Sequence, residues 1–285
     1  MITTASWEPR FLLGFIRLVE DYSFEFVLMY YFSDYSNVSL ENRNKVKSIC
    51  NKKNIPIKEI ELNQDLNSWI SIFNSLGDSK LKDKEILVDI STMPRETIWI
   101  VFHILQNFTS RIQYIYNKPE GYSNEWLSRD PGKPRLVYKL SGIAELGKPT
   151  TLVVITGFDI DRVNQLIYFF EPETTLLGIQ IGSQFSNLKL NSEKHIKEFT
   201  NTPGIKIFDV DAYSDDRGLN TIRKHLLDYV DNSNLIMSSL GPKLTAVSLF
   251  KIAQEFDNVA LSYAPSNEFN IEYSRGIGDT LTGTI

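Results

Sequence analysis

Two stretches of the chain, 148 residues apart, follow one short pattern. Residues 85–96 read EILVDISTMPRE and residues 234–244 read NLIMSSLGPKL. Each has an apolar run, then small hydroxyl residues, then a proline followed by a base, and each opens a long apolar stretch. Proline is favoured just inside the start of a helix, so the pattern predicts two strand–turn–helix segments whose helices begin at Pro94 and Pro242. Such a turn lies at the carboxyl end of its strand, where open α/β sheets bind ligands.

The similarity extends beyond these two turns. ITTASWEPRFLLGFIRLVED aligns with VITGFDIDRVNQLIYFFEP, which places Arg10 opposite Arg162 at an offset of 152. Farther along, YIYNKPEGYSNEWLSR aligns with LSYAPSNEFNIEYSR, which places Ser128 opposite Ser274 at an offset of 146. Small loop deletions account for the drift between these offsets. A period near 150 residues suits a duplicated domain rather than a solenoid.

The predicted elements have the same order in both halves. Apolar strand-like runs alternate with amphipathic helix-like runs, which is typical of parallel sheets joined by helices. NVALSYAP (258–265) is expected to be the last strand, and residues 128–150 are expected to hold a hairpin, with RLVYKL as an added strand, followed by a linker. The prediction is an α/β protein of two tandem Rossmann-like domains, with mainly parallel sheets related by a pseudo-two-fold axis. Domain 1 is expected to span 1–148, including the hairpin and linker, and domain 2 to span 149–285.

Composition restricts the classes of function. With 42% hydrophobic and 23% charged residues, the 285-residue chain can bury a full core. A net charge of −5 argues against generic duplex nucleic-acid binding, although a local basic pocket is compatible with it. No apolar run approaches the ~20 residues that a membrane helix needs, and no secretory signal is recognised. The single cysteine, Cys50, fits a reducing compartment. We therefore expect a cytoplasmic protein that does not enter a membrane.

The strongest candidate site is the pair of repeated turns. A helix start presents unpaired N–H groups and the positive end of the helix dipole, so an anion such as phosphate is the expected ligand. Hydroxyl groups and bases at the turns complete the predicted site, which comprises Ser91, Thr92 and Arg95 in the first half, and Ser238, Ser239, Gly241 and Lys243 in the second. The alternative is two capped helices with exposed bases. A base beside the positive helix end is mildly unfavourable, so its presence in both copies favours a binding role.

Arg10 and Arg162 are further candidates for ligand binding. Each follows an acid, in WEPR and DIDR, one turn into the helix after the first strand of its half. Either they face the repeated turn, or they form local acid–base pairs such as Asp159 with Arg162, and the sequence leaves both readings open. Arg129 and Arg275, each preceded by serine, are expected to decorate a hairpin.

No metal or cofactor is predicted. His103, His195 and His225 lie on three different expected helices without ligand spacing, and Cys50 has no partner of that kind. No GxGxxG follows a strand, and no GxxxxGK[ST] occurs.

The two turns resemble those of the CRISPR-associated Rossmann-fold (CARF) sensor domains. In that family a strand leads through a Gly/Thr/Ser-rich turn to a base and a helix, and a cyclic oligonucleotide lies across a dimer axis between two such turns. STMPR and SSLGPK occupy the matching place, with Arg95 and Lys243 as the base, and ITTAS and ITGFD match the family's first turn. The double-glycine turn of the family is absent, because only Gly241 remains. The resemblance implies a sensor or ring-opening subunit without an effector nuclease.

The functional prediction is a nucleotide sensor, and the resemblance implies a role in antiviral defence. A nucleotide-type anion or other phosphorylated small ligand, with a cyclic oligonucleotide as one candidate, would bind between the two halves. Two alternatives stay open. The first is a hydrolase of phosphodiester or glycosidic bonds in a nucleotide, in which Lys243 stabilises developing charge. The second is a non-catalytic scaffold that binds a protein partner in a defence complex.

Overall fold

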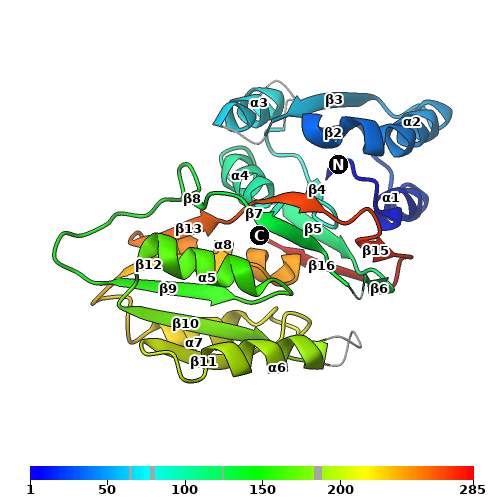
Figure 1. Cartoon of the computed structure of the whole chain (residues 1–285). Helices are drawn as coiled ribbons and strands as arrows, with labels where there is room; N and C mark the ends of the chain where they lie inside the picture. The colour runs from blue at the N-terminus through cyan, green and yellow to red at the C-terminus, as the bar shows by residue number, and fades with distance from the viewer. Residues whose placement is uncertain (64–65, 78–80, 124, 183–187) are drawn as a thin grey trace. The chain divides into compact units, whose positions relative to one another are not determined.

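A computed structural model describes residues 1–285 except 64–65, 78–80, 124 and 183–187 (Figure 1). Contacts between Cα atoms divide it into two compact units. Unit 1 comprises residues 1–123 and 271–285, and unit 2 comprises residues 124–270. These units are defined by contacts between residues. The boundary expected at 148/149 was derived from the sequence repeat instead, and it stays a prediction.

Unit 1 is built on a six-stranded sheet in the order β16-β5-β4-β1-β2-β3. Its sheet strands are β1 (Ile2–Thr4), β2 (Val27–Phe32), β3 (Ile57–Leu62), β4 (Ile86–Asp89), β5 (Ile112–Asn117) and β16 (Thr280–Thr284). The helices are α1 (Pro9–Asp21), η1 (Ser33–Tyr35), α2 (Ser36–Lys52), α3 (Leu66–Gly77) and α4 (Arg95–Leu105). A two-stranded pair, β6 (Gly121–Tyr122) and β15 (Ser274–Arg275), also belongs to this unit.

Unit 2 repeats this order of strands. Its sheet reads β8-β13-β12-β9-β10-β11. The sheet strands are β8 (Arg135–Leu136), β9 (Thr150–Ile155), β10 (Thr174–Gln180), β11 (Ile205–Val210), β12 (Asn234–Ser239) and β13 (Val259–Tyr263). The helices are α5 (Ile160–Phe170), α6 (Leu188–Phe199), α7 (Leu219–Leu226) and α8 (Lys243–Glu255), and a further strand pair joins β7 (Ser128–Pro131) to β14 (Ser266–Phe269).

Five strands of each sheet are parallel, and only the outermost strand, β16 or β8, is antiparallel to its neighbour. The predicted α/β class with two mainly parallel, Rossmann-like sheets is therefore confirmed. Consecutive parallel strands need a crossover connection, which is usually a helix. This explains why strand-like and helix-like segments alternate along the sequence.

After the fifth strand of each half, the predicted strand list was only partly right: the added strand expected in RLVYKL is present as β8, but other strands differ. NVALSYAP is not the last strand, because β14, β15 and β16 follow it. The expected hairpin within 128–150 is also absent, since β7 pairs with β14 and β8 pairs with β13 rather than with each other. The antiparallel edge strand of each sheet thus comes from a segment far away in the sequence from its neighbour: β16 joins β5, and β8 joins β13. We call this arrangement the reciprocal strand exchange.

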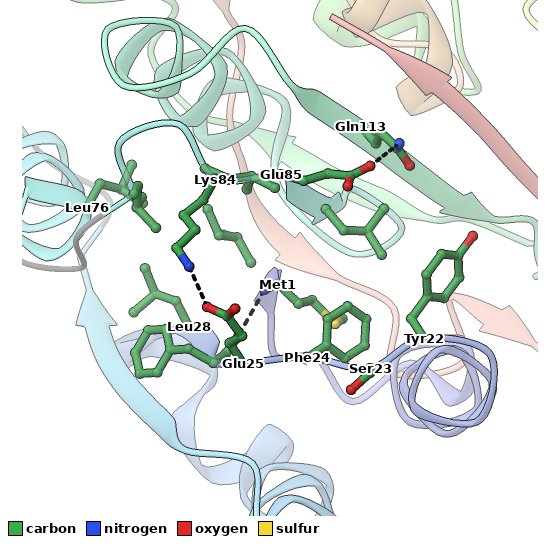
Figure 2. A pocket seen from close by; sticks show the side chains of 15 residues that line it. Met1, Tyr22, Ser23, Phe24, Glu25, Leu28, Leu76, Lys84, Glu85 and Gln113 are labelled. Carbon is green, nitrogen blue, oxygen red and sulfur yellow. Dashed lines mark hydrogen bonds and ion pairs between the residues drawn. The ribbon is translucent and has the colours of Figure 1, made fainter.

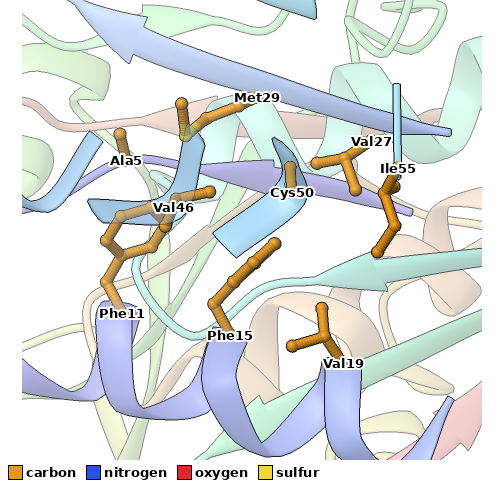
Figure 3. Close-up of a cluster of buried hydrophobic side chains, with 9 residues drawn as sticks. All are labelled: Ala5, Phe11, Phe15, Val19, Val27, Met29, Val46, Cys50 and Ile55. Carbon is orange, nitrogen blue, oxygen red and sulfur yellow. The ribbon is translucent and has the colours of Figure 1, made fainter. Parts of the chain in front are cut away.

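The core of unit 1 shows why β2 reads as a continuous apolar run. Val27 and Met29 point toward α1 and α2, where they pack with the cluster drawn in Figure 3. The next residue, Tyr30, points to the opposite face, where its hydroxyl group lies 3.0 Å from the Ser75 hydroxyl of α3. Because helices cover both faces, neither face of the strand requires polar residues.

Helix α1 allows a matched test of this core. Leu18→Ala removes a side chain that is 1% exposed, whereas Leu13→Ala makes the same change where the side chain is 41% exposed. We expect Leu18→Ala to lower the free energy of unfolding by about 2–5 kcal/mol, and Leu13→Ala to change it by about 0.5 kcal/mol or less. Urea denaturation measures both values, and equal effects would contradict the packing described for α1.

Candidate functional site

The turn after β4 is held together by its own polar side chains. The Asp89 carboxylate accepts hydrogen bonds from the Ser91 backbone N–H at 2.9 Å and from the Thr3 hydroxyl at 3.3 Å. The Ser91 hydroxyl accepts from the Asn117 backbone N–H at 2.7 Å, and the Thr92 hydroxyl donates to the Thr4 carbonyl at 2.7 Å. The two predicted hydroxyls are buried and link β4 to strands β5 and β1. Their contacts define the shape of the turn.

The turn after β12 uses its hydroxyls in a similar way. Ser238 donates to the Ser262 carbonyl on β13 at 3.1 Å. The Thr245 hydroxyl donates to the Pro242 carbonyl at 2.8 Å, so its single proton is already used, and the Ser239 hydroxyl, 2.7 Å away, is the donor of that second bond. Both serines are buried. Hydroxyl groups therefore brace the start of α8 as they brace the turn before α4.

The two bases occupy the first position of their helices. Helix α4 begins at Arg95 and α8 at Lys243, while Pro94 and Pro242 are the N-cap residues, with extended ψ angles of 147°. The prediction that each proline lies inside its helix is thus wrong by one residue. The Pro94 carbonyl still accepts the first helical bond, from Ile98 at 2.9 Å. Both bases are half-buried and lie at the amino end of a helix, where the helix dipole is positive.

Two loops of unit 2 are in backbone contact at this edge. A Cβ atom placed on Gly157, after β9, would lie 2.1 Å from the Leu240 carbonyl oxygen, and one placed on Gly241 would lie 2.6 Å from the Thr156 carbonyl oxygen. Unit 1 joins the corresponding loops through the Thr92 hydroxyl instead. Gly241, a predicted ligand residue, therefore has a steric reason to be glycine.

Arg10 lies in a fully buried polar cluster. Its Nε donates to Glu8 at 2.9 Å, and its Nη1 approaches the Tyr116 hydroxyl at 3.4 Å and the Asn117 carbonyl at 3.5 Å. Burial alone would lower the pKa of Arg10, but the Glu8 carboxylate and the Tyr122 and Tyr116 hydroxyls raise it, and the net shift is upward. The guanidinium group is therefore a permanent cation.

Arg162 occupies a similar cluster in unit 2. Asp159 caps α5 by accepting from the Arg162 backbone N–H at 3.2 Å, and its carboxylate also accepts from Arg162 Nε at 2.8 Å. The guanidinium group further donates to the Ala264 carbonyl at 3.3 Å and to the Ser128 hydroxyl at 3.0 Å. The acid–base pair that the sequence left open is present, and it is buried rather than solvated.

The two clusters share a feature that the sequence did not reveal. In unit 1, Ser274 donates to the Glu8 carboxylate at 2.6 Å, and in unit 2, Ser128 accepts from Arg162. Ser128 and Ser274 are the serines that align at an offset of 146. Each cluster thus holds a serine that lies far from it in the sequence, on the strand pairs β7–β14 and β6–β15.

Within each unit, the predicted residues converge on one strand. In unit 1, Arg10 and Ser91 both contact Asn117 at the end of β5. In unit 2, Arg162 contacts Ala264, just past β13, while Ser238 contacts Ser262 on that strand. Sequence reasoning missed Asp89 and Asn117. An aspartate two residues before a serine is an Asx-turn signal that could have identified Asp89.

The described part of the chain holds no group of three or more His, Cys, Asp or Glu side chains placed to bind a metal ion. Among the helices of the described residues, none combines the length and apolar character needed to cross a membrane.

Comparison with known proteins gives a likeness of fold. No protein-family model matches the sequence, and no curated protein matches it. A type III CRISPR defence DNA nuclease activated by cyclic oligoadenylate superposes over 87% of this chain with a TM-score of 0.53 and 8% identity. The matched part spans 63% of that nuclease. The cytoplasmic domain of a prokaryotic cation chloride cotransporter matches 95% of this chain and 97% of its own, with a TM-score of 0.30 and 11% identity.

The glycine contact predicts a sharp steric effect. Gly157→Ala forces the Leu240 carbonyl to move, whereas a Cβ atom at Gly77, the last residue of α3, meets no atom within 4 Å. We expect Gly157→Ala to destabilise the protein by about 1–3 kcal/mol, and Gly77→Ala to change its stability by about 0.5 kcal/mol or less. Thermal denaturation compares the two variants, and an equal effect would contradict the close approach of the loops.

The buried pair of Arg162 predicts a structural cost of its removal. Arg162→Met leaves Asp159 charged and buried, which we expect to cost about 3–5 kcal/mol. Lys189→Met breaks an exposed pair with Glu193, whose charged atoms are 3.9 Å apart, and is expected to cost about 0.5 kcal/mol or less. Chemical denaturation of both variants tests the difference. A small loss of unfolding free energy for Arg162→Met would contradict a structural role for this arginine and would favour a role in ligand binding.

Proposed function

We propose that this protein is a nucleotide sensor that binds a nucleotide-type anion, with a cyclic oligonucleotide as the preferred candidate, at the turns that precede α4 and α8. The proposal rests on one observation above all. In each unit, the helix that follows β4 or β12 begins with a basic residue. Arg95 and Lys243 place a positive charge next to helix N–H groups, where an oxyanion gains most.

The remaining predicted residues have a supporting role in this proposal. Ser91, Thr92, Ser238 and Ser239 hold the two turns through internal hydrogen bonds, and Gly241 lets two loops meet. Arg10 and Arg162 brace the neighbouring strand, and their charges are balanced by Glu8 and Asp159. Direct contacts with phosphate oxygens are assigned to the side chains of Arg95 and Lys243, and the positive dipole ends of α4 and α8 favour the bound anion.

Two lines of support connect these turns to sensing. The resemblance of STMPR and SSLGPK to CARF turns came from sequence alone. The fold likeness, found independently, includes a nuclease that is activated by cyclic oligoadenylate. We propose on this basis a role in antiviral defence, in a chain that arose by duplication near residue 148.

Binding measurements on variants test the proposal. A cyclic oligoadenylate panel of several ring sizes, with linear oligoadenylates and ATP, is titrated by calorimetry. A charge-assisted hydrogen bond contributes roughly 1.5–3 kcal/mol, and each 1.4 kcal/mol is about tenfold in affinity. We therefore expect Arg95→Ala and Lys243→Ala each to weaken binding of the preferred ligand by about 10- to 100-fold.

The controls remove the same charges elsewhere. Arg111→Ala acts near the amino end of β5, and Lys58→Ala acts on the edge strand β3; both should leave affinity unchanged. One ligand per chain, weakened by both single variants, would mean that both turns contact the same molecule. Chromatography of the recovered ligand distinguishes a sensor from a ring-opening hydrolase. No binding by any member of the panel would contradict the proposal and favour the scaffold.

A further inference from the structure

Unit 1 contains a pocket of about 600 Å³ at the opposite edge of its sheet from the turns discussed above (Figure 2). Ile2 begins β1, Phe26 directly precedes β2, Ile86 begins β4, and Gln113 is the second residue of β5, so the pocket lies at the amino ends of these strands. Its size is within the range of pockets that bind small molecules.

The walls of this amino-edge pocket combine apolar side chains with a polar rim. One wall is the irregular segment between α1 and β2, which carries Tyr22, Phe24 and Phe26. The rings of Tyr22 and Phe24 are stacked, with centroids 6.1 Å apart. The other wall includes Leu76 and the segment that leads into β4. An apolar body, particularly an aromatic one, is suited to these walls.

The charges at the rim are not balanced. Lys84 is neutralised by Glu25, whose carboxylate lies 2.8 Å from its ammonium group, and the two side chains face each other in Figure 2. Glu85 accepts a hydrogen bond from the uncharged Gln113 amide at 2.8 Å and has no basic partner among the described residues. The pocket therefore retains the negative charge of Glu85.

Among the described residues that line the pocket, the other group that can carry a positive charge is the amino group of Met1. It donates to the Phe26 carbonyl at 2.8 Å, and burial lowers its pKa to about 6, so at neutral pH it is mainly uncharged. Lys84 is already paired with Glu25. No positive charge among the described lining residues therefore balances the negative charge of the Glu85 carboxylate.

We propose that the amino-edge pocket binds a small organic cation, an amine with an aromatic or alkyl body, through Glu85 and the aromatic wall. The ammonium group pairs with the Glu85 carboxylate, and the apolar body lies along Phe24 and Phe26. Aromatic faces attract cations in addition to apolar groups, so the two parts of the pocket favour the same class of ligand. This site is independent of the nucleotide site proposed above.

Three ligands of equal shape test the charge preference. 4-Phenylbutylamine, 4-phenylbutanol and 4-phenylbutyrate differ only in their end group, and calorimetry measures their binding to the full chain. We expect saturable binding of the amine, at least tenfold weaker binding of the alcohol, and no measurable binding of the carboxylate. Absence of saturable binding by the amine, or equal binding of amine and carboxylate, would overturn the proposal.

Variants at the rim locate the binding site. Glu85→Gln should weaken amine binding about tenfold and leave alcohol binding unchanged. Lys84→Gln should tighten amine binding severalfold, because it frees the Glu25 carboxylate. Glu198→Gln, an exposed glutamate on α6 of unit 2, is the matched control and should change neither. Because the two rim variants act in opposite directions, general destabilisation cannot imitate the expected result, and unchanged amine affinity in both would overturn the assignment.

Discussion

The fold depends on how the outer edge of each parallel sheet is paired. An exposed edge leaves a row of unpaired backbone groups. Here β5 is covered by β16, and β13 by β8, and each added strand is antiparallel. Backbone hydrogen bonds continue beyond the pairing, for example from Lys118 to the Asp279 carbonyl at 2.9 Å. The reciprocal strand exchange therefore completes both sheets, and it explains why unit 1 is discontinuous in sequence.

The same exchange reaches the buried arginines. The segment leading to β16 brings Ser274 to Glu8, and Arg17 donates to the Gly278 carbonyl at 3.0 Å and to the Thr280 hydroxyl at 2.7 Å. In unit 2, β7 brings Ser128 to Arg162. A charge buried beside a sheet edge requires satisfied partners, and the exchanged segments supply some of them. The segments that complete each sheet therefore also help to hold the strand next to each turn.

Sequence reasoning found the parallel strands because their apolar runs are distinctive, and it found the turns because proline and a base follow small hydroxyl residues. It missed β16, whose sequence TLTGT alternates threonine with leucine and glycine and buries little; this strand is specified mainly by backbone pairing with β5. It placed Arg10 and Arg162 correctly after their first strands but could not choose their partners, because Ser274 lies 266 residues from Glu8. The amino-edge pocket carries no motif, since its lining comes from the starts of four strands.

The chain order of the exchanged strand also constrains how the protein is made. Chains generally begin to fold from the N-terminal side as they emerge from the ribosome. Unit 1 starts first, yet the edge of β5 that faces away from β4 stays unpaired until residues 280–284 have been synthesised, after all of unit 2. Unit 2 is continuous from residue 124 to 270 and includes β8. The unit that begins second is therefore the first to have its complete sheet, and the exposed edge of β5 must avoid other partners throughout that interval.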